Sequence, residues 1–396
     1  MEGNIVNYIT QIRGVSYKPS DLHDSLNKNS IILLRANNIN NGKIDFEDVV
    51  YVDKSKVSET QVLRKNDILI CASSGSKKLV GKAASFNESI ECTFGAFCKV
   101  IRPRNILGSY LSAFFQSEYY RFHISQLANG ANINNIKNEH INSFSIPERS
   151  FEEQKEISYK VSYLNGIIES YNRELDLLDE LIKARFVEMF GDPMINPYKW
   201  KVINISEVLR AKASNGFFSR RDDYCDDGNV KVLGVANVVN RMYSQVVDLP
   251  RTNANERDIE KFEVKYGDML FCRSSLVAEG IGKASIIPEG VQTNILFECH
   301  VIRLPLDLDK CVPEFLQTLS TTKFFRNQII SKSKTATMTT IGQDGILKTN
   351  IILPPLEKQK EYYNFVKQID KSRSRIQKSL EASQELFDSL MQEYFG

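Results

Sequence analysis

The amino-acid sequence contains two copies of one unit, arranged head to tail. Matched segments occur in the same order in both copies, first at an offset of 201 residues and then at 205. The pairs at 201 are residues 67–74 with 268–275, 81–83 with 282–284, and 100–102 with 301–303; the pairs at 205 are residues 119–121 with 324–326, 154–156 with 359–361, and 188–191 with 393–396. This predicts one insertion of four residues in the second copy. A period near 200 residues is too long for a solenoid repeat, so each copy is predicted to be a domain-sized unit.

Length and composition limit the class of protein. A chain of 396 residues suits two or three domains, each with its own core. Because 51 basic residues are balanced by 49 acidic ones, any polyanion site must be local or shared with a basic partner. The seven scattered cysteines, without a CxxC pair, predict buried thiols in a reducing compartment. Without a long apolar run or a signal peptide, we expect a soluble cytoplasmic protein.

Each copy has the pattern of a small mixed α/β domain. Short runs of Val, Ile and Leu are separated by Asn, Gly and Ser, which is typical of strands joined by turns. The predicted strands are residues 31–34, 68–71, 98–101, 230–235, 269–272 and 299–302, and the predicted helices are residues 110–126 and 314–330.

A heptad pattern follows residue 150 and returns at the end of the chain. Steps of four and three residues are typical of a coiled-coil seam. The first seam comprises Ile157, Val161, Leu164, Ile168, Tyr171, Leu175, Leu178 and Ile182, and the second comprises Tyr362, Val366, Ile369, Arg373, Ile376, Leu380, Ser383 and Phe387. Ser150 with Glu153 predicts a capping box at the first helix start, and Gly191 before Pro193 predicts its end.

The predicted organisation therefore has four parts. These are a first globular domain (1–150), a helix (151–191), a second globular domain (192–353) and a second helix (354–396). A helix of about forty residues is roughly 60 Å long, and a single apolar stripe needs a partner. If closed symmetry relates the copies, a pseudo-twofold axis makes the two helices an antiparallel coiled coil.

Several motifs extend this organisation to a known family. Residues 186–193 lead through Asn196, Pro197, Trp200 and Lys201 into the second domain, which carries residues 268–273 and the proline-led helix start at 354–359. With these motifs the chain resembles, over nearly its whole length, the specificity subunits of type I restriction-modification enzymes. The first copy lacks the Trp-Lys lead-in, so its first strand is expected to be shortened.

The resemblance implies a subunit without a catalytic centre. It implies that two target-recognition domains each read one half of a split double-stranded DNA target, while the helices fix the unread spacer. It also implies docking of two methyltransferase subunits on the helices, and the joining of motor nuclease (restriction) subunits. S-adenosylmethionine, ATP and Mg would then belong to these partner subunits, with no cofactor and no membrane contact for this chain.

The residues themselves do not form a recognised catalytic motif. Residues 75–83 resemble a phosphate-binding loop, but the glycine spacing is one residue too long and Ala83 stands where Ser or Thr would meet magnesium. Glu153 with Lys155 is interpreted as a solvated helix turn, and Asn196-Pro197-Tyr198 as a turn. The histidines, His23, His123, His140 and His300, lack metal-ligand spacing.

Candidate DNA contacts lie in loops where the copies share a framework but differ in content. Base reading uses Arg, Lys, Asn and Gln, and phosphates attract Lys, Arg and small hydroxyls. The candidates in the first copy are Arg35, Asn37, Asn38, Ser73, Ser74, Lys77, Lys78, Asn132, Asn134 and Asn135; those in the second are Arg220, Arg221, Asn237, Arg273, Ser274, Ser275, Thr337, Thr339 and Thr340. Arg273 is the strongest candidate because it leaves a predicted strand directly into a loop.

Three alternatives remain open. The polar residues could be ordinary turns, because Asn, Ser and Gly populate loops for backbone reasons. The chain could serve a related methyltransferase-nuclease with a different subunit plan. It could also be a duplicated coiled-coil scaffold that binds only protein, without sequence-specific DNA binding.

Overall fold

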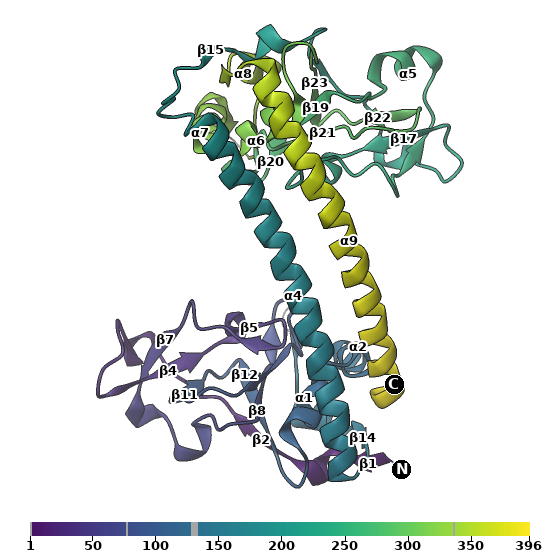
Figure 1. Cartoon of the computed structure of the whole chain (residues 1–396). Helices are drawn as coiled ribbons and strands as arrows, with labels where there is room; N and C mark the ends of the chain where they lie inside the picture. The colour runs from purple at the N-terminus through teal and green to yellow at the C-terminus, as the bar shows by residue number, and fades with distance from the viewer. Residues whose placement is uncertain (1, 77, 128–133, 336) are drawn as a thin grey trace. The chain divides into compact units, whose positions relative to one another are not determined.

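The computed structural model describes residues 2–76, 78–127, 134–335 and 337–396 (Figure 1). The chain forms two compact units. Unit 1 comprises Met1–Arg173 together with Gln377–Gly396, and unit 2 comprises Glu174–Ile376. Two long helices, α4 (Phe151–Phe190) and α9 (Leu356–Phe395), each contribute one part to unit 1 and the other part to unit 2.

Unit 1 combines two four-stranded sheets with short ladders and helices. The first sheet has the order β10 (Ala83–Phe86), β8 (Asp67–Cys71), β12 (Cys98–Pro103) and β2 (Ile9–Arg13), and the second has β11 (Cys92–Phe94), β4 (Ser30–Leu34), β7 (Val50–Asp53) and β3 (Leu22–His23). The two-stranded ladders are β1 (Glu2–Asn4) with β14 (Ser145–Pro147), β5 (Ile39–Asn40) with β6 (Lys43–Ile44), and β9 (Ser73–Ser74) with β13 (Asn134–Asn135). The short helices are α1 (Gly108–Gln116), α2 (Glu118–Leu127) and α3 (Asn138–Asn142).

Unit 2 repeats this arrangement. Its four-stranded sheet has the order β16 (Ser214–Asn215), β23 (Val301–Pro305), β19 (Asp268–Cys272) and β21 (Ala284–Ile286), and its second sheet has β18 (Arg251–Thr252), β17 (Val230–Leu233) and β22 (Ile295–Phe297). The remaining strands are β15 (Lys201–Asn204) with β26 (Asn350–Leu353), and β20 (Ser274–Ser275), β25 (Thr339–Thr340) and β24 (Lys334–Thr335). The short helices are α5 (Glu256–Phe262), α6 (Pro313–Thr321), α7 (Lys323–Lys332) and α8 (Gln343–Leu347).

The strand pairing confirms the duplication but corrects its register. Cys71 of β8 lies opposite Cys98 of β12, whereas the equivalent Cys272 of β19 lies opposite Val301 of β23. Cys98 therefore corresponds to Val301, so the predicted match of residues 100–102 with 301–303 is wrong by two positions. The offset changes in two steps of two residues, not in one step of four. The false match arose because both buried strands use the same few β-branched residues.

The termini of α4 form as the sequence predicted. The Ser150 backbone N–H donates to Glu153 Oε2 at 2.7 Å, and the Glu153 N–H donates to Ser150 Oγ at 3.3 Å, which completes the capping box. At the other end Gly191 has φ +74°, and a Cβ there would lie 2.4 Å from Pro197 Cγ. Glycine is therefore required both by the backbone conformation and by the close approach of Pro197.

The two long helices pack together in opposite directions. In the core of unit 1, Ile157 near the start of α4 packs with Met391 and Phe395 near the end of α9. In the core of unit 2, Ile182 near the end of α4 packs with Tyr362 near the start of α9. The pairing is antiparallel, as predicted.

The predicted seam is not equally buried along its length. Ile157, Val161, Leu164, Ile182, Tyr362, Val366 and Ile369 are buried, whereas Ile168, Tyr171, Leu175, Leu178, Arg373, Ile376, Leu380, Ser383 and Phe387 are half-buried. All of the buried positions except Leu164 belong to the core of their unit, and the half-buried Leu178 and Phe387 pack against the same cores. Neither long helix, nor any other helix within the described residues, carries an apolar stretch of membrane-crossing length.

Candidate nucleic-acid interface

In unit 1 the fold joins two of the predicted candidate stretches. Strand β9 pairs with β13, placing Ser73 opposite Asn135 and Ser74 opposite Asn134. The ladder continues from the four-stranded sheet, because the Ile136 N–H donates to the Ala72 carbonyl oxygen at 2.8 Å. Asn135 and Lys78 are exposed, and the two serines are half-buried. Segments about sixty residues apart in the sequence therefore meet in one polar ladder.

Unit 2 builds an equivalent ladder in which the Ser-Ser strand is kept and the strand opposite it carries threonines in place of asparagines. Ser274 lies opposite Thr340 and Ser275 opposite Thr339, and β24 extends the ladder to three strands. The Ile341 N–H donates to the Arg273 carbonyl oxygen at 3.1 Å, which is the counterpart of the Ile136 bond in unit 1. We call the β9–β13 pair and the β20–β25–β24 set the two ribbons.

Arg273 lies where β19 passes into the ribbon of unit 2. Its backbone N–H donates to the His300 carbonyl oxygen at 2.8 Å, which fixes the main chain. Its Nη1 donates to the Cys299 carbonyl oxygen at 3.4 Å, and the side chain is half-buried. The guanidinium therefore has a defined position and retains donors for a ligand.

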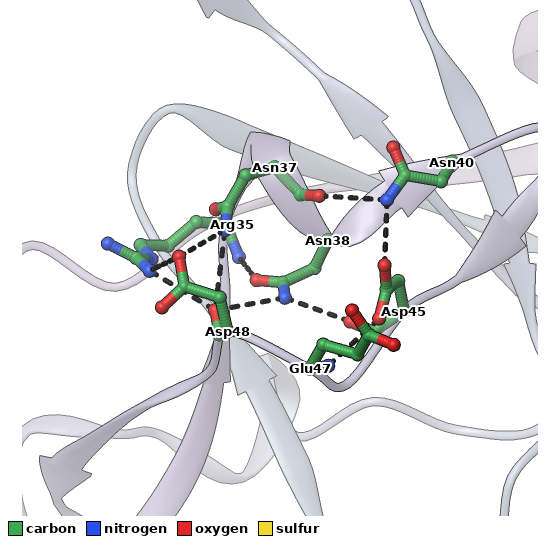
Figure 2. A network of polar contacts seen from close by, with 7 residues as sticks. All are labelled: Arg35, Asn37, Asn38, Asn40, Asp45, Glu47 and Asp48. Carbon is green, nitrogen blue, oxygen red and sulfur yellow. Dashed lines mark hydrogen bonds and ion pairs between the residues drawn. The ribbon is translucent and has the colours of Figure 1, made fainter. Parts of the chain in front are cut away.

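The third candidate stretch of unit 1 forms an internal network instead (Figure 2). Arg35 Nη2 and Asn37 Nδ2 both donate to Asp48 Oδ2, at 2.9 and 2.8 Å. Asn38 accepts from the Arg35 N–H at 2.8 Å and donates to the Asp45 carbonyl oxygen at 2.8 Å. Asn38 is only 1% exposed, so its predicted DNA contact is wrong. Its amide is used to hold the turn.

The equivalent turn in unit 2 shows that this role is structural. Asn237 Oδ1 accepts from the Gly234 N–H at 3.0 Å, as Asn38 does from the N–H of Arg35. Asn237 ends the short 3-10 helix Val235–Asn237, and Asn38 ends Ala36–Asn38. For both asparagines the turn interpretation fits the observed bonds.

The other candidates are divided by burial. Thr339 is 1% exposed, and its hydroxyl lies 3.0 Å from that of Thr335, so its predicted DNA contact is also wrong. Thr337, Thr340 and Arg220 are exposed. Lys77 and Asn132 lie outside the described residues, as do the side chains of Asn134 and Arg221.

Unit 2 also contains a cleft of about 600 Å³ between the long helices and the globular part. Arg241, Lys283, Arg326, Asp370 and Arg373 are among its lining residues. Beside it, the Tyr243 hydroxyl donates to Glu314 Oε1 at 3.2 Å. Burial raises the pKa of Glu314 to about 7 and also raises the pKa of Asp370. Within the described residues, no cluster of His, Cys, Asp and Glu has the form of a metal site.

The sequence-based candidates for DNA contact are all polar, so they do not include the apolar residues beside the ribbon of unit 2. Leu276 and Val277 follow β20 directly and are 82% and 58% exposed. Their position after the matched segment 268–275 is the only sequence signal that could have drawn attention to them.

Comparison with known proteins agrees with this duplicated architecture. Residues 197–384 match the family model described as type I restriction modification DNA specificity domain. The type I restriction enzyme EcoKI specificity subunit of Escherichia coli (strain K12) is 32% identical over 390 residues, which cover 94% of this chain and 82% of that subunit. The chain belongs to the type I restriction enzyme specificity subunits.

Other specificity subunits support the same assignment. The StySPI specificity subunit of Salmonella potsdam is 32% identical over 397 residues, and this alignment covers 97% of this chain and 84% of that subunit. The crystal structure of a type I restriction-modification S subunit from M. genitalium superposes with a TM-score of 0.55 at 12% identity, covering 100% of this chain and 96% of that one. This specificity subunit therefore shares its fold with a solved member at low sequence identity.

Proposed function

We propose that this specificity subunit gives a type I restriction-modification complex its DNA sequence specificity, and that each unit binds one half of a bipartite double-stranded DNA target. The observation that carries the proposal is the pair of ribbons. They occupy equivalent places in both units. The Ser-Ser strand is the same in each, but the strand opposite it carries asparagines in unit 1 and threonines in unit 2, a difference that two readers of different half-sites require. Family membership supplies the class of ligand.

In this proposal the chain recognises DNA and does not catalyse a reaction. The helices α4 and α9, which belong to both units, set the length of unread DNA and dock two methyltransferase subunits. Restriction subunits join that complex. S-adenosylmethionine, ATP and Mg bind the partner subunits, and this chain contributes the ribbons and the helices.

Methylation mapping of a host with and without the gene tests the proposal. A split, asymmetric methylated motif that appears only with the gene is the expected result. A gel-shift series with the methyltransferase partner, at stated salt, supplies the second test, because phosphate binding falls steeply with salt. Binding without sequence preference at low salt would favour the protein-binding scaffold instead.

A further inference from the structure

The tip of the loop after β20 carries two unusually exposed aliphatic side chains. Leu276 is 82% exposed, the largest exposed fraction among the large hydrophobic residues that the structure describes, and Val277 is 58% exposed. Burying an aliphatic side chain away from water lowers the free energy. Two adjacent exposed aliphatic side chains therefore indicate a surface that a binding partner covers.

The loop that carries them is held in place. Ser275 Oγ accepts from the Val277 N–H at 3.3 Å, and the Gly280 N–H donates to the Val277 carbonyl oxygen at 3.1 Å. A Cβ at Gly280 would lie 2.1 Å from Ser275 Oγ, so the turn closes tightly. Arg326 Nη2 donates to the Glu279 carbonyl oxygen at 3.1 Å and fixes the far side of the loop to α7. A preordered loop loses little conformational entropy on binding.

The position of the tip identifies what would cover it. Leu276 immediately follows the ribbon of unit 2, between Ser275 and the start of the short helix Ala278–Gly280. Leu276 lies next to β20, an outer strand of the three-stranded ribbon. The apolar group that base pairs expose in the DNA major groove is the thymine 5-methyl. We propose that Leu276, supported by Val277, contacts the 5-methyl group of a thymine in the half-site bound by unit 2. This inference rests on the proposed function.

Unit 1 does not repeat this contact. At the offset of 201 residues that relates β8 to β19, Gly75 and Ser76 stand where unit 2 has Leu276 and Val277. The apolar contact therefore distinguishes the two half-sites. Apolar residues can also wedge between base steps from the minor groove, which is the rival binding mode.

The test uses the complex reconstituted with its methyltransferase partner and a duplex carrying the mapped target. Each thymine is replaced in turn by deoxyuridine, which removes only the methyl group. We expect Leu276→Ala to weaken specific binding about tenfold, and deoxyuridine at thymines of one half-site to weaken binding of the wild-type complex by a similar factor. In Leu276→Ala, deoxyuridine at the same position should cause no further loss. Val247→Ala is the matched control, because Val247 is 61% exposed in unit 2 but lies outside the ribbon and its loop. The complex that carries Val247→Ala should bind the target DNA with unchanged affinity.

Four results would overturn the inference while leaving the proposed function intact. Leu276→Ala could bind as tightly as Val247→Ala although the wild type still selects its target. The losses from Leu276→Ala and from deoxyuridine could be additive at every thymine, or the target could contain no thymine. A 2-aminopurine probe could brighten next to one base step only when Leu276 is present, which would indicate a wedge. A wild-type complex without sequence preference would instead remove the proposed function itself.

Discussion

Arg326 on α7 donates a hydrogen bond from Nη2 to the main-chain carbonyl oxygen of Glu279, 3.1 Å away. The same bond occurs in unit 1, where Arg121 Nη2 donates to the Lys78 carbonyl oxygen at 2.9 Å. Arg326 and Arg121 are 205 residues apart, whereas Glu279 and Lys78 are 201 residues apart. The bond therefore joins two segments of the duplicated unit that have different offsets. In both units it connects a helix to the loop that follows the ribbon.

Removing this contact should affect one half-site at a time. A hydrogen bond from a charged donor contributes about 1.5 to 3 kcal/mol, so we expect Arg326→Ala to weaken discrimination at the half-site of unit 2 roughly tenfold. Arg121→Ala is the matched variant for the other half-site. Competition binding with single-base changes in each half measures both. Equal loss in both halves from either variant would contradict the assignment.

Arg273→Ala should also weaken binding to one half-site only. A bidentate base contact contributes about 1 to 3 kcal/mol of discrimination, which corresponds to a loss of roughly 10- to 100-fold. Affinity measured over a salt series separates base reading from phosphate binding, because losing a phosphate contact lowers the salt slope by about one. Ala72 stands at the equivalent place in unit 1, so no corresponding loss is expected there.

Tyr362→Phe tests the docking of α9 in unit 2. The buried Tyr362 hydroxyl lies 2.9 Å from Thr318 Oγ1 and 3.3 Å from the Ile182 carbonyl oxygen, and its single O–H is shared between these two acceptors, one on α6 and one on α4. We expect a loss of about 1 kcal/mol in the free energy of unfolding and a fall of roughly 2 to 4 °C in the Tm of unit 2. Ile157, its counterpart in unit 1, has no hydroxyl. An unchanged Tm in calorimetry would show that these bonds do not stabilise the packing.

Glu314 should make the stability of unit 2 depend on pH. Burial raises its pKa from 4.5 to about 7, with smaller contributions from Glu289 and Asp370, while Tyr243 opposes the shift. The folded state therefore holds the proton more tightly than the unfolded state, and stability falls as pH rises from about 4.5 to 7 and then levels off. The full effect is about 3 kcal/mol. Thermal unfolding at constant ionic strength measures it, and Glu314→Gln should flatten the profile; a wild-type profile already flat over this range would refute the prediction.

The sequence was informative wherever a regular period or a local pattern controls the structure. The steps from Ile157 to Ile182 repeat a helical spacing, and Ser150 with Glu153 forms a capping pattern over four residues, so α4 could be predicted with its start. The duplication also directed the search for DNA contacts to loops where the two copies share a framework but differ in content. The structure joins two of these stretches in each unit as a ribbon, and their contact with DNA stays a prediction.

Burial and strand register could not be read in the same way. Asn38 and Asn37 are adjacent and chemically identical, yet one is buried in the turn and the other is exposed. Thr339 and Thr340 differ likewise, because successive side chains of a strand point to opposite faces. The register of β12 and β23 is set by their pairing with β8 and β19. It could not be predicted from the sequence, because the two strands contain similar residues at more than one alignment. Leu276 resembles any core leucine until its surroundings are known.

The discontinuity of unit 1 has a consequence for synthesis on the ribosome. Its core contains Met391 and Phe395, which close over Tyr110 and Phe114 with ring centroids of Phe395 at 5.2 and 6.0 Å from theirs. Residues 1–173 leave the ribosome first, but the contacts of Tyr110 and Phe114 with Phe395 can form only after residues 377–396 have been translated. Unit 1 therefore receives its last core residues after the whole of unit 2 has been translated, although its own translation begins first.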